Sequence, residues 1–175
     1  ATNTSIEAVY AGLYNVINRC NFMLDRVDRV RNNTTDDKDL YKLDQCCGEA
    51  YFARAIAYSE LVKMFCKAYE SDEDAANQLG VILTKHYQGN EEMKRASLKA
   101  SYEFILEDLD RAAQLLALDK DYDPSVDGAL FNNATYFNEY TVYALRARVA
   151  LYMRKWDEAI KYSSKVIDSE YYLLA

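Results

Sequence analysis

Apolar residues recur at intervals of three and four positions along nearly the whole 175-residue chain. This spacing places them on one face of an α-helix, whereas a half-buried strand would alternate apolar and polar residues. No alternation of useful length occurs, and the chain has only 5 Gly and 1 Pro to interrupt a helix. The sequence therefore predicts an all-α domain without strands.

The same pattern predicts five helices and the segments that separate them. The helices are expected over residues 4–30, 40–65, 97–116, 139–154 and 156–169. A polar stretch at 32–37 turns the chain and supplies a cap for the second helix. Two longer segments, Ala68–Ala96 and Asp119–Asn138, lose the periodicity. Loops of this length in a compact domain are usually functional or disordered.

Residues 139–172 match one tetratricopeptide unit, a pair of antiparallel helices of roughly 34 residues. The small side chains of Ala147 and Ala159 permit a close helix crossing, and Tyr143 and Trp156 fill its flanks. Because one unit cannot bury its own faces, further helical hairpins must stack against it. The predicted fold class is therefore all-α, with antiparallel helical hairpins of tetratricopeptide type and two long loops.

Charge and residue types exclude several classes of function. The formal net charge of −7 argues against a nucleic-acid partner, because phosphate recognition needs clustered Lys and Arg. His86 is the only histidine, so a His-based zinc site or a His-dependent triad cannot form within this chain alone. The sequence contains no nucleophile elbow and no marked pair of catalytic carboxylates. We therefore expect a non-enzymatic protein without a metal or cofactor.

Two explanations remain open for the cysteines, which show no zinc or redox spacing. If the first two helices form a hairpin around Asn33, Cys20 lies level with Cys46 and Cys47. A disulfide could then form in an exported protein. Buried free thiols are the favoured alternative, because free cysteine behaves as a small core hydrophobe.

Arg54 and Arg148 lie on helices that are otherwise mostly apolar. Buried charges are normally paired, because an isolated charge in an apolar interior is very costly. We therefore expect each arginine to pair with a carboxylate in a structural role.

The helices also carry an ordered set of motifs. These are Tyr14-x2-Ile17-x3-Asn21-x2-Leu24, Glu49-Ala50-Tyr51-Phe52-Ala53-Arg54-Ala55, Gly80-Val81-Ile82-Leu83-Thr84-Lys85, Tyr102-x2-Ile105-x2-Asp108-Leu109 and Trp156-x2-Ala159. In this order they resemble the SusD/RagB-like nutrient-binding lipoproteins of the Bacteroidetes outer membrane, and they cover almost the whole chain. The chain departs from the family's usual Phe-Gly at Phe65-Cys66.

The resemblance implies that residues 1–175 form one helical domain, the N-terminal part of a longer, surface-exposed outer-membrane lipoprotein. Such a protein binds a glycan or peptide nutrient and delivers it to a SusC-type TonB-dependent transporter. Its only attachment to the membrane is a lipid anchor outside this chain. Most ligand-site residues are then expected in a C-terminal half that the chain does not include. A free-standing tetratricopeptide adaptor that binds protein segments is the alternative.

The candidate ligand-binding residues are Tyr69, His86 and Tyr87, all within Ala68–Ala96. That segment is longer than a connection between neighbouring helices requires. Its flat aromatic rings suit the faces of sugar rings or a partner surface. The alternative is that residues 81–83 attach the loop to the helices and the aromatic rings cover this attachment.

Overall fold

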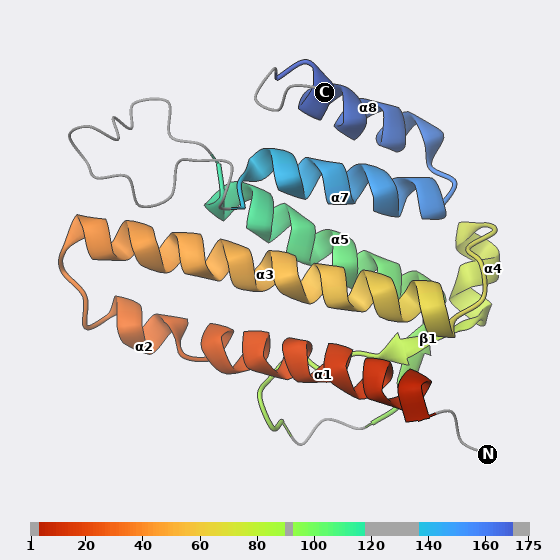
Figure 1. The fold of residues 1–175 in the computed structure, drawn as a ribbon, viewed down its shortest axis with the longest axis horizontal. Coiled ribbons are helices and arrows are strands. Elements are labelled where there is room, and N and C mark those ends of the chain that lie inside the picture. Colours follow the sequence, from red (N-terminus) through yellow and green to blue (C-terminus); the bar gives the residue numbers. More distant parts are fainter. Residues whose placement is uncertain (1–3, 90–92, 118–136, 170–175) are drawn as a thin grey trace.

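The computed structural model describes residues 4–89, 93–117 and 137–169. Its elements are α1 (Thr4–Leu24), α2 (Val27–Arg31), α3 (Asp37–Phe65), α4 (Asp72–Asn77), β1 (Leu79–Ile82), β2 (Arg95–Ser97), α5 (Leu98–Leu115), α7 (Glu139–Tyr152) and α8 (Trp156–Ile167). Figure 1 shows the long helices packed antiparallel in the order α1, α3, α5, α7 and α8. The predicted all-α class with antiparallel helical hairpins is confirmed.

Local signals explain where the helices begin. Asp36 caps α3 by accepting hydrogen bonds from the amides of residues 38 and 39, as the polar stretch before it predicts. Ser97 caps α5, and Asn138 forms a capping box at the start of α7. The first predicted helix differs from the structure, because a turn at Asp25 and Arg26 divides it into α1 and α2.

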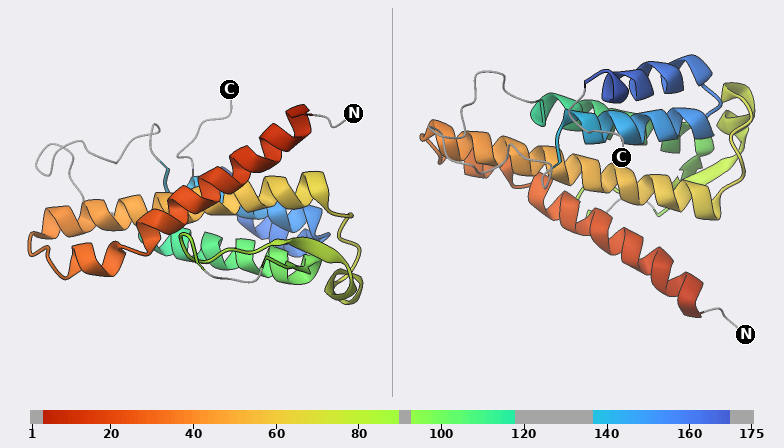
Figure 2. Two further views of the ribbon diagram at one scale, coloured as in Figure 1. Left: turned by 90° about the horizontal axis from the view of Figure 1, so that it is seen from below. Right: turned by 45° about the horizontal axis from the view of Figure 1, so that its top comes forward.

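The core lies between α3 and α5, and the neighbouring helices α1 and α7 add side chains to it. Tyr58 and Leu61 of α3 and Ile105 and Leu109 of α5 are fully buried. Ile17 of α1 is equally buried, although Figure 2 shows the N-terminal end of α1 leaning away from the other helices. Burying one such aliphatic side chain stabilises the fold by about 1.5–3 kcal/mol. The buried side chains between α3 and α5 therefore make a large contribution to the stability of the domain.

The expectation of a structure without strands is wrong at two short segments. β1 and β2 pair antiparallel, with Leu79 opposite Ser97 and Ile82 opposite Arg95. A Cβ added to Gly80 would overlap the Ser101 hydroxyl and meet the Ser97 carbonyl oxygen at 2.5 Å, so β1 lies directly against the start of α5. Strands of four and three residues are too short to produce a recognisable alternation.

The segment Ala68–Ala96 is also more ordered than the fading periodicity predicts. It contains α4, which Ser71 caps by accepting a hydrogen bond from the Asp74 amide, the whole of β1 and the first two residues of β2. Residues 90–92 of this segment and residues 119–136 of the second predicted loop lie outside the described residues.

The four cysteines are free thiols, with Cys20 and Cys47 buried and Cys46 exposed. The structure therefore contains no disulfide between Cys20 and Cys46 or between Cys20 and Cys47. This outcome agrees with the favoured prediction of free thiols. Cys20 and Cys47 are also buried, as that prediction expects.

α7 and α8 form an antiparallel hairpin at one side of the domain (Figure 1). The rings of Tyr143 and Tyr162 pack with their centroids 5.7 Å apart across it. Trp156, expected to fill a flank, is 57% exposed. The tetratricopeptide unit over residues 139–172 therefore stays a prediction, and its last residues lie outside the described range.

Candidate functional site

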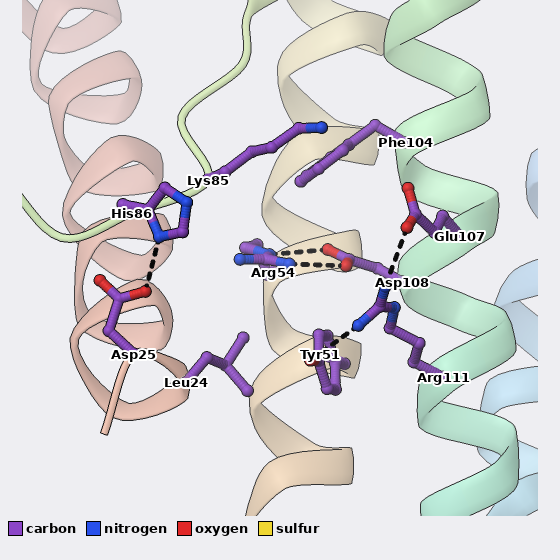
Figure 3. A pocket seen from close by; sticks show the side chains of 10 residues that line it. All are labelled: Leu24, Asp25, Tyr51, Arg54, Lys85, His86, Phe104, Glu107, Asp108 and Arg111. Atoms are coloured by element: carbon purple, nitrogen blue, oxygen red, sulfur yellow. Dashed lines mark hydrogen bonds and ion pairs between the residues drawn. The ribbon is translucent and has the colours of Figure 1, made fainter. Parts of the chain in front are cut away.

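A pocket of about 290 Å³ lies between the C-terminal end of α1, the middle of α3 and α5, and residues 83–89 (Figure 3). We refer to residues 83–89, which follow β1, as the 83–89 segment. The segment supplies Lys85 and His86 to the pocket, and α5 supplies Phe104 and Arg111 from the opposite side. The pocket therefore joins parts of the chain that are far apart in sequence.

Arg54 and Asp108 form a buried ion pair in the wall of the pocket. Arg54 donates two parallel hydrogen bonds to the Asp108 carboxylate, of 2.8 and 2.7 Å, and a third of 2.6 Å to Asn21 Oδ1. Burial acts to lower the pKa of Arg54, but the bonds to Asp108 outweigh this effect and raise it. The predicted structural pairing of Arg54 is confirmed.

Arg148 also pairs with a carboxylate, since its Nη2 lies 3.4 Å from Glu60 Oε1. The two side chains are 48% and 26% exposed. The pairing itself agrees with the prediction, but its position at the surface gives it a much smaller effect on stability than a buried pair.

Asp25 fixes the rim of the pocket by binding two consecutive residues of the 83–89 segment. Its Oδ1 lies 2.8 Å from His86 Nδ1, and its Oδ2 accepts a 2.7 Å hydrogen bond from the Tyr87 amide. Burial acts to raise the pKa of Asp25, but these two hydrogen bonds outweigh it, so the pKa lies below its usual value. The carboxylate therefore stays ionised and holds the segment against α1.

Aromatic rings and cations alternate around the pocket. The Arg54 guanidinium lies 5.1 Å from the centre of the Phe104 ring, and Lys85 Nζ lies 5.8 Å from the same centre. Arg111 donates a 3.3 Å hydrogen bond to the Tyr51 hydroxyl and pairs with Glu107 at 3.1 Å. The pocket thus offers apolar ring surface together with both donors and acceptors.

His86 also borders a second hollow of about 460 Å³ between α1 and the 83–89 segment. Asn15 and Asn18 of α1 contribute amide groups to this hollow, and Gln88 contributes a third from the segment. Its lining residues include no Asp, Glu, Lys or Arg, whereas the first pocket is lined by several ionic side chains.

Tyr87 lies next to these hollows in an aromatic group on the surface. Its ring meets Phe22 edge-on, with the centroids 4.9 Å apart, and the Arg26 guanidinium lies 3.6 Å from the centre of Phe22. Phe22 is 44% exposed. The group leaves flat aromatic surface accessible beside His86.

The structure places Tyr69 away from the other two candidates. Its side chain is 2% exposed, its hydroxyl donates to Asp72 at 2.8 Å, and its ring packs edge-on against Tyr102. Its side chain belongs to the core around α5 and borders a different hollow, of about 320 Å³, from the two that His86 lines. His86 and Tyr87 come together at one rim, and Tyr69 does not join them.

Several pocket residues had no signal of their own in the sequence. Asp25, Tyr51, Phe104 and Arg111 occupy helical positions or a helix end, and their spacing reports only which face of a helix they share. Their meeting with the 83–89 segment depends on contacts between distant parts of the chain.

Two further properties of the described residues bear on function. Across residues 4–89, 93–117 and 137–169, no group of three or more His, Cys, Asp or Glu side chains is placed to hold a metal ion. The helices in these ranges are all too short or too polar to cross a membrane.

Comparison with known proteins gives consistent results for this architecture. Residues 1–151 match the model of a SusD-like family described as "Starch-binding associating with outer membrane". A SusD-like carbohydrate binding protein from Bacteroides vulgatus matches with 23% identity and a TM-score of 0.71, covering 95% of this chain and 32% of its own. A SusD-like protein from Bacteroides fragilis matches with 27% identity and a TM-score of 0.68, covering 96% of this chain and 28% of its own. A laminarin binding SusD-like protein matches with 21% identity and a TM-score of 0.66, covering 91% of this chain and 29% of its own.

The chain thus spans about a third of the length of the solved structures that it matches. None of the curated proteins is significantly similar to it. The family model nevertheless covers residues from the start of α1 into the last turn of α7, which include every element around the pocket. The chain belongs to the SusD-like family.

Proposed function

We propose that this chain is the helical N-terminal part of a surface-exposed outer-membrane lipoprotein that binds a nutrient glycan and delivers it to a SusC-type TonB-dependent transporter. The match of residues 1–151 to the SusD-like family, described as starch-binding and associated with the outer membrane, carries this proposal. The family description and the laminarin-binding relative favour a glycan over a peptide. Proteins of this family bind ligands rather than transform them, so we expect no turnover.

The rim of the pocket offers the chemistry that a glycan requires. A sugar ring presents apolar C–H faces, which pack on aromatic rings, and hydroxyls that both donate and accept hydrogen bonds. The exposed Phe22 and the half-buried Tyr87 supply aromatic surface, and His86 with the neighbouring charged pairs supplies donors and acceptors. We therefore propose His86 and Tyr87 as ligand-contacting residues within a larger site.

Binding to a panel of starch and laminarin tests this function in the full-length protein. The double substitution of His86 and Tyr87 to Ala should weaken glycan binding, measured by calorimetry, with little change in melting temperature. Tyr152→Ala is the matched control, because Tyr152 is also an exposed aromatic residue, 47% accessible, but lies at the end of α7. A large fall in melting temperature with unchanged binding would assign His86 and Tyr87 to packing instead.

One observation favours the alternative of a tetratricopeptide adaptor that binds protein segments. α8 exposes Trp156, Ile160 and Ile167, which are 57%, 64% and 59% accessible and lie along one side of the helix. The two functions separate in one comparison. Loss of glycan uptake and of copurification with the transporter in the His86 and Tyr87 variant supports the nutrient-binding function. Glycan-independent capture of a protein that requires Trp156 supports the adaptor.

A further inference from the structure

Side chains of α1 and α3, rather than a neighbouring strand, hold the backbone around the start of the 83–89 segment. Tyr14 and Asn21 of α1 and Asp25, which directly follows α1, are separated by seven and four residues. This spacing places the three side chains on the same side of the helix. Tyr14 exchanges two hydrogen bonds with the backbone of Ile82, at 3.1 and 3.0 Å. From α3, the Tyr58 hydroxyl accepts a 2.9 Å bond from the Thr84 amide. Side chains of the long helices therefore hold both Ile82, at the end of β1, and Thr84, within the segment.

Asn21 makes the central attachment. It is fully buried, and its Nδ2 donates to the carbonyl oxygens of Thr84 at 3.0 Å and His86 at 3.4 Å. Its Oδ1 accepts the 2.6 Å bond from Arg54. One amide side chain thus bonds to the segment on one side and to the buried arginine on the other.

The arginine is itself fixed in direction. Its planar guanidinium binds both oxygens of Asp108, and a bidentate pair of this kind permits little rotation. The third nitrogen, Nη1, therefore points to a defined position, where it meets Asn21 Oδ1. This bond also orients the amide of Asn21 so that its NH2 group faces the segment.

From this chain of contacts we propose that Asn21 is the positioning residue for the ligand-contacting part of the 83–89 segment. It transfers the fixed geometry of the buried Arg54–Asp108 pair to the backbone that presents His86 and Tyr87. Its effect on ligand affinity rests on the proposed function, but its effect on the backbone does not. A segment held in its binding conformation avoids the entropy cost of becoming ordered when the ligand arrives.

The substitution Asn21→Asp separates the contact of residue 21 with Arg54 from its contacts with the 83–89 segment. The carboxylate keeps an acceptor for Arg54 but cannot donate to the carbonyl oxygens of Thr84 and His86. Loss of one net hydrogen bond corresponds to about tenfold in an opening equilibrium. Hydrogen exchange at the amides of Thr84 and Tyr87 should therefore become about tenfold faster in the full-length protein. Asn21→Ala, which adds no buried charge, provides the same measurement if the Asp variant does not fold.

Asn138→Ala is the matched control. Asn138 is likewise a buried asparagine, 2% exposed, but it caps α7 and makes none of these contacts with the segment. It should lower the melting temperature without changing exchange at Thr84 and Tyr87. The affinity for starch or laminarin, whichever the wild type binds, should fall about tenfold in the Asn21 variants and stay unchanged in this control.

The outcomes distinguish the positioning role from the proposed function. If the Asn21 variants lower the melting temperature as Asn138→Ala does while exchange at the two amides stays at the wild-type rate, Asn21 is a core residue only and the inference is wrong. If the wild type binds neither glycan, the proposed ligand class is wrong, and exchange alone decides the role of Asn21. Faster exchange with unchanged glycan affinity would also overturn the inference, because the segment would then not need to be positioned.

Discussion

Removing one partner of the Arg54–Asp108 pair should destabilise the domain far more than removing both. Arg54 and Asp108 are 7% and 2% exposed, so Arg54→Met leaves a carboxylate, and Asp108→Leu a guanidinium, without its counter-charge in the interior. Breaking a buried pair in this way costs about 3–5 kcal/mol. Two charge-assisted hydrogen bonds, each worth about 1.5–3 kcal/mol, give about 3–6 kcal/mol, which overlaps this range.

The double variant should be much closer to the wild type. Burial raises the pKa of Asp108 above its usual value even beside the guanidinium, so removing this carboxylate from water carries a large cost. Replacing both by apolar side chains of similar volume removes this desolvation cost. What remains is the lost bond to Asn21 Oδ1, about 1–3 kcal/mol for an unsatisfied buried acceptor.

Urea denaturation followed by circular dichroism measures the three variants against the wild type. A loss of 3–5 kcal/mol corresponds to a fall of about 6–20 °C in melting temperature for a domain of this size. Arg148→Met is the control, because its exposed pair with Glu60 should contribute only about 0–1 kcal/mol. The reasoning fails if the double variant is as unstable as the sum of the single ones, or if Arg54→Met costs no more than Arg148→Met.

Three further outcomes follow from the structure. Gly80→Ala should destabilise the domain by about 1–3 kcal/mol through overpacking, whereas Gly12→Ala, where a Cβ would meet nothing within 4 Å, should stabilise it slightly; thermal melts of both variants decide. The lowered pKa of Asp25 means that its contribution to folding is complete above the ordinary aspartate value, about 3.9, and is lost as the pH falls through the lower folded value. The difference in unfolding free energy between wild type and Asp25→Asn should therefore begin to shrink below about pH 4 and vanish below the folded pKa, and a constant difference would contradict the assignment. A thiol reagent should label the exposed Cys46 in the native protein but Cys47 only on unfolding, because burial shields Cys47 and raises the pKa of its thiol to about 11; equal rates would refute this.

Periodicity predicted the helices well where a helix has one continuous buried face. In α5, Leu98, Ile105 and Leu109 follow the expected spacing and are all fully buried. The periodicity did not predict the structure where a short turn or a pairing between distant residues determines it. The turn at Asp25 and Arg26 leaves the apolar spacing on both sides intact, and the pairing of β1 with β2 comes from contacts across more than a dozen residues.

Most of the candidate site lay beyond this kind of reasoning for a physical reason. The hydrogen bonds that attach the 83–89 segment join residues 26 to 65 positions apart. Nothing in the local sequence of Thr84 or His86 indicates a partner on α1, because most of these bonds join a side chain to a backbone group of a kind that nearly every residue carries. The segment could be recognised as a candidate from its aromatic residues, but its conformation could not.

Asn21 is the exception, since its position in the sequence does carry a signal. It stands in the middle of the apolar stripe formed by Ile17, Cys20 and Leu24, at the spacing that places a side chain in the core. An amide buried there without partners would cost about 1–3 kcal/mol, so its presence predicts at least one polar group of another element beside it. The structure supplies partners on both sides of this side chain, the Arg54 guanidinium and the carbonyl oxygens of the 83–89 segment. A polar residue at the centre of a buried helical stripe therefore marks the place where an irregular segment attaches, even when the sequence of that segment predicts no structure.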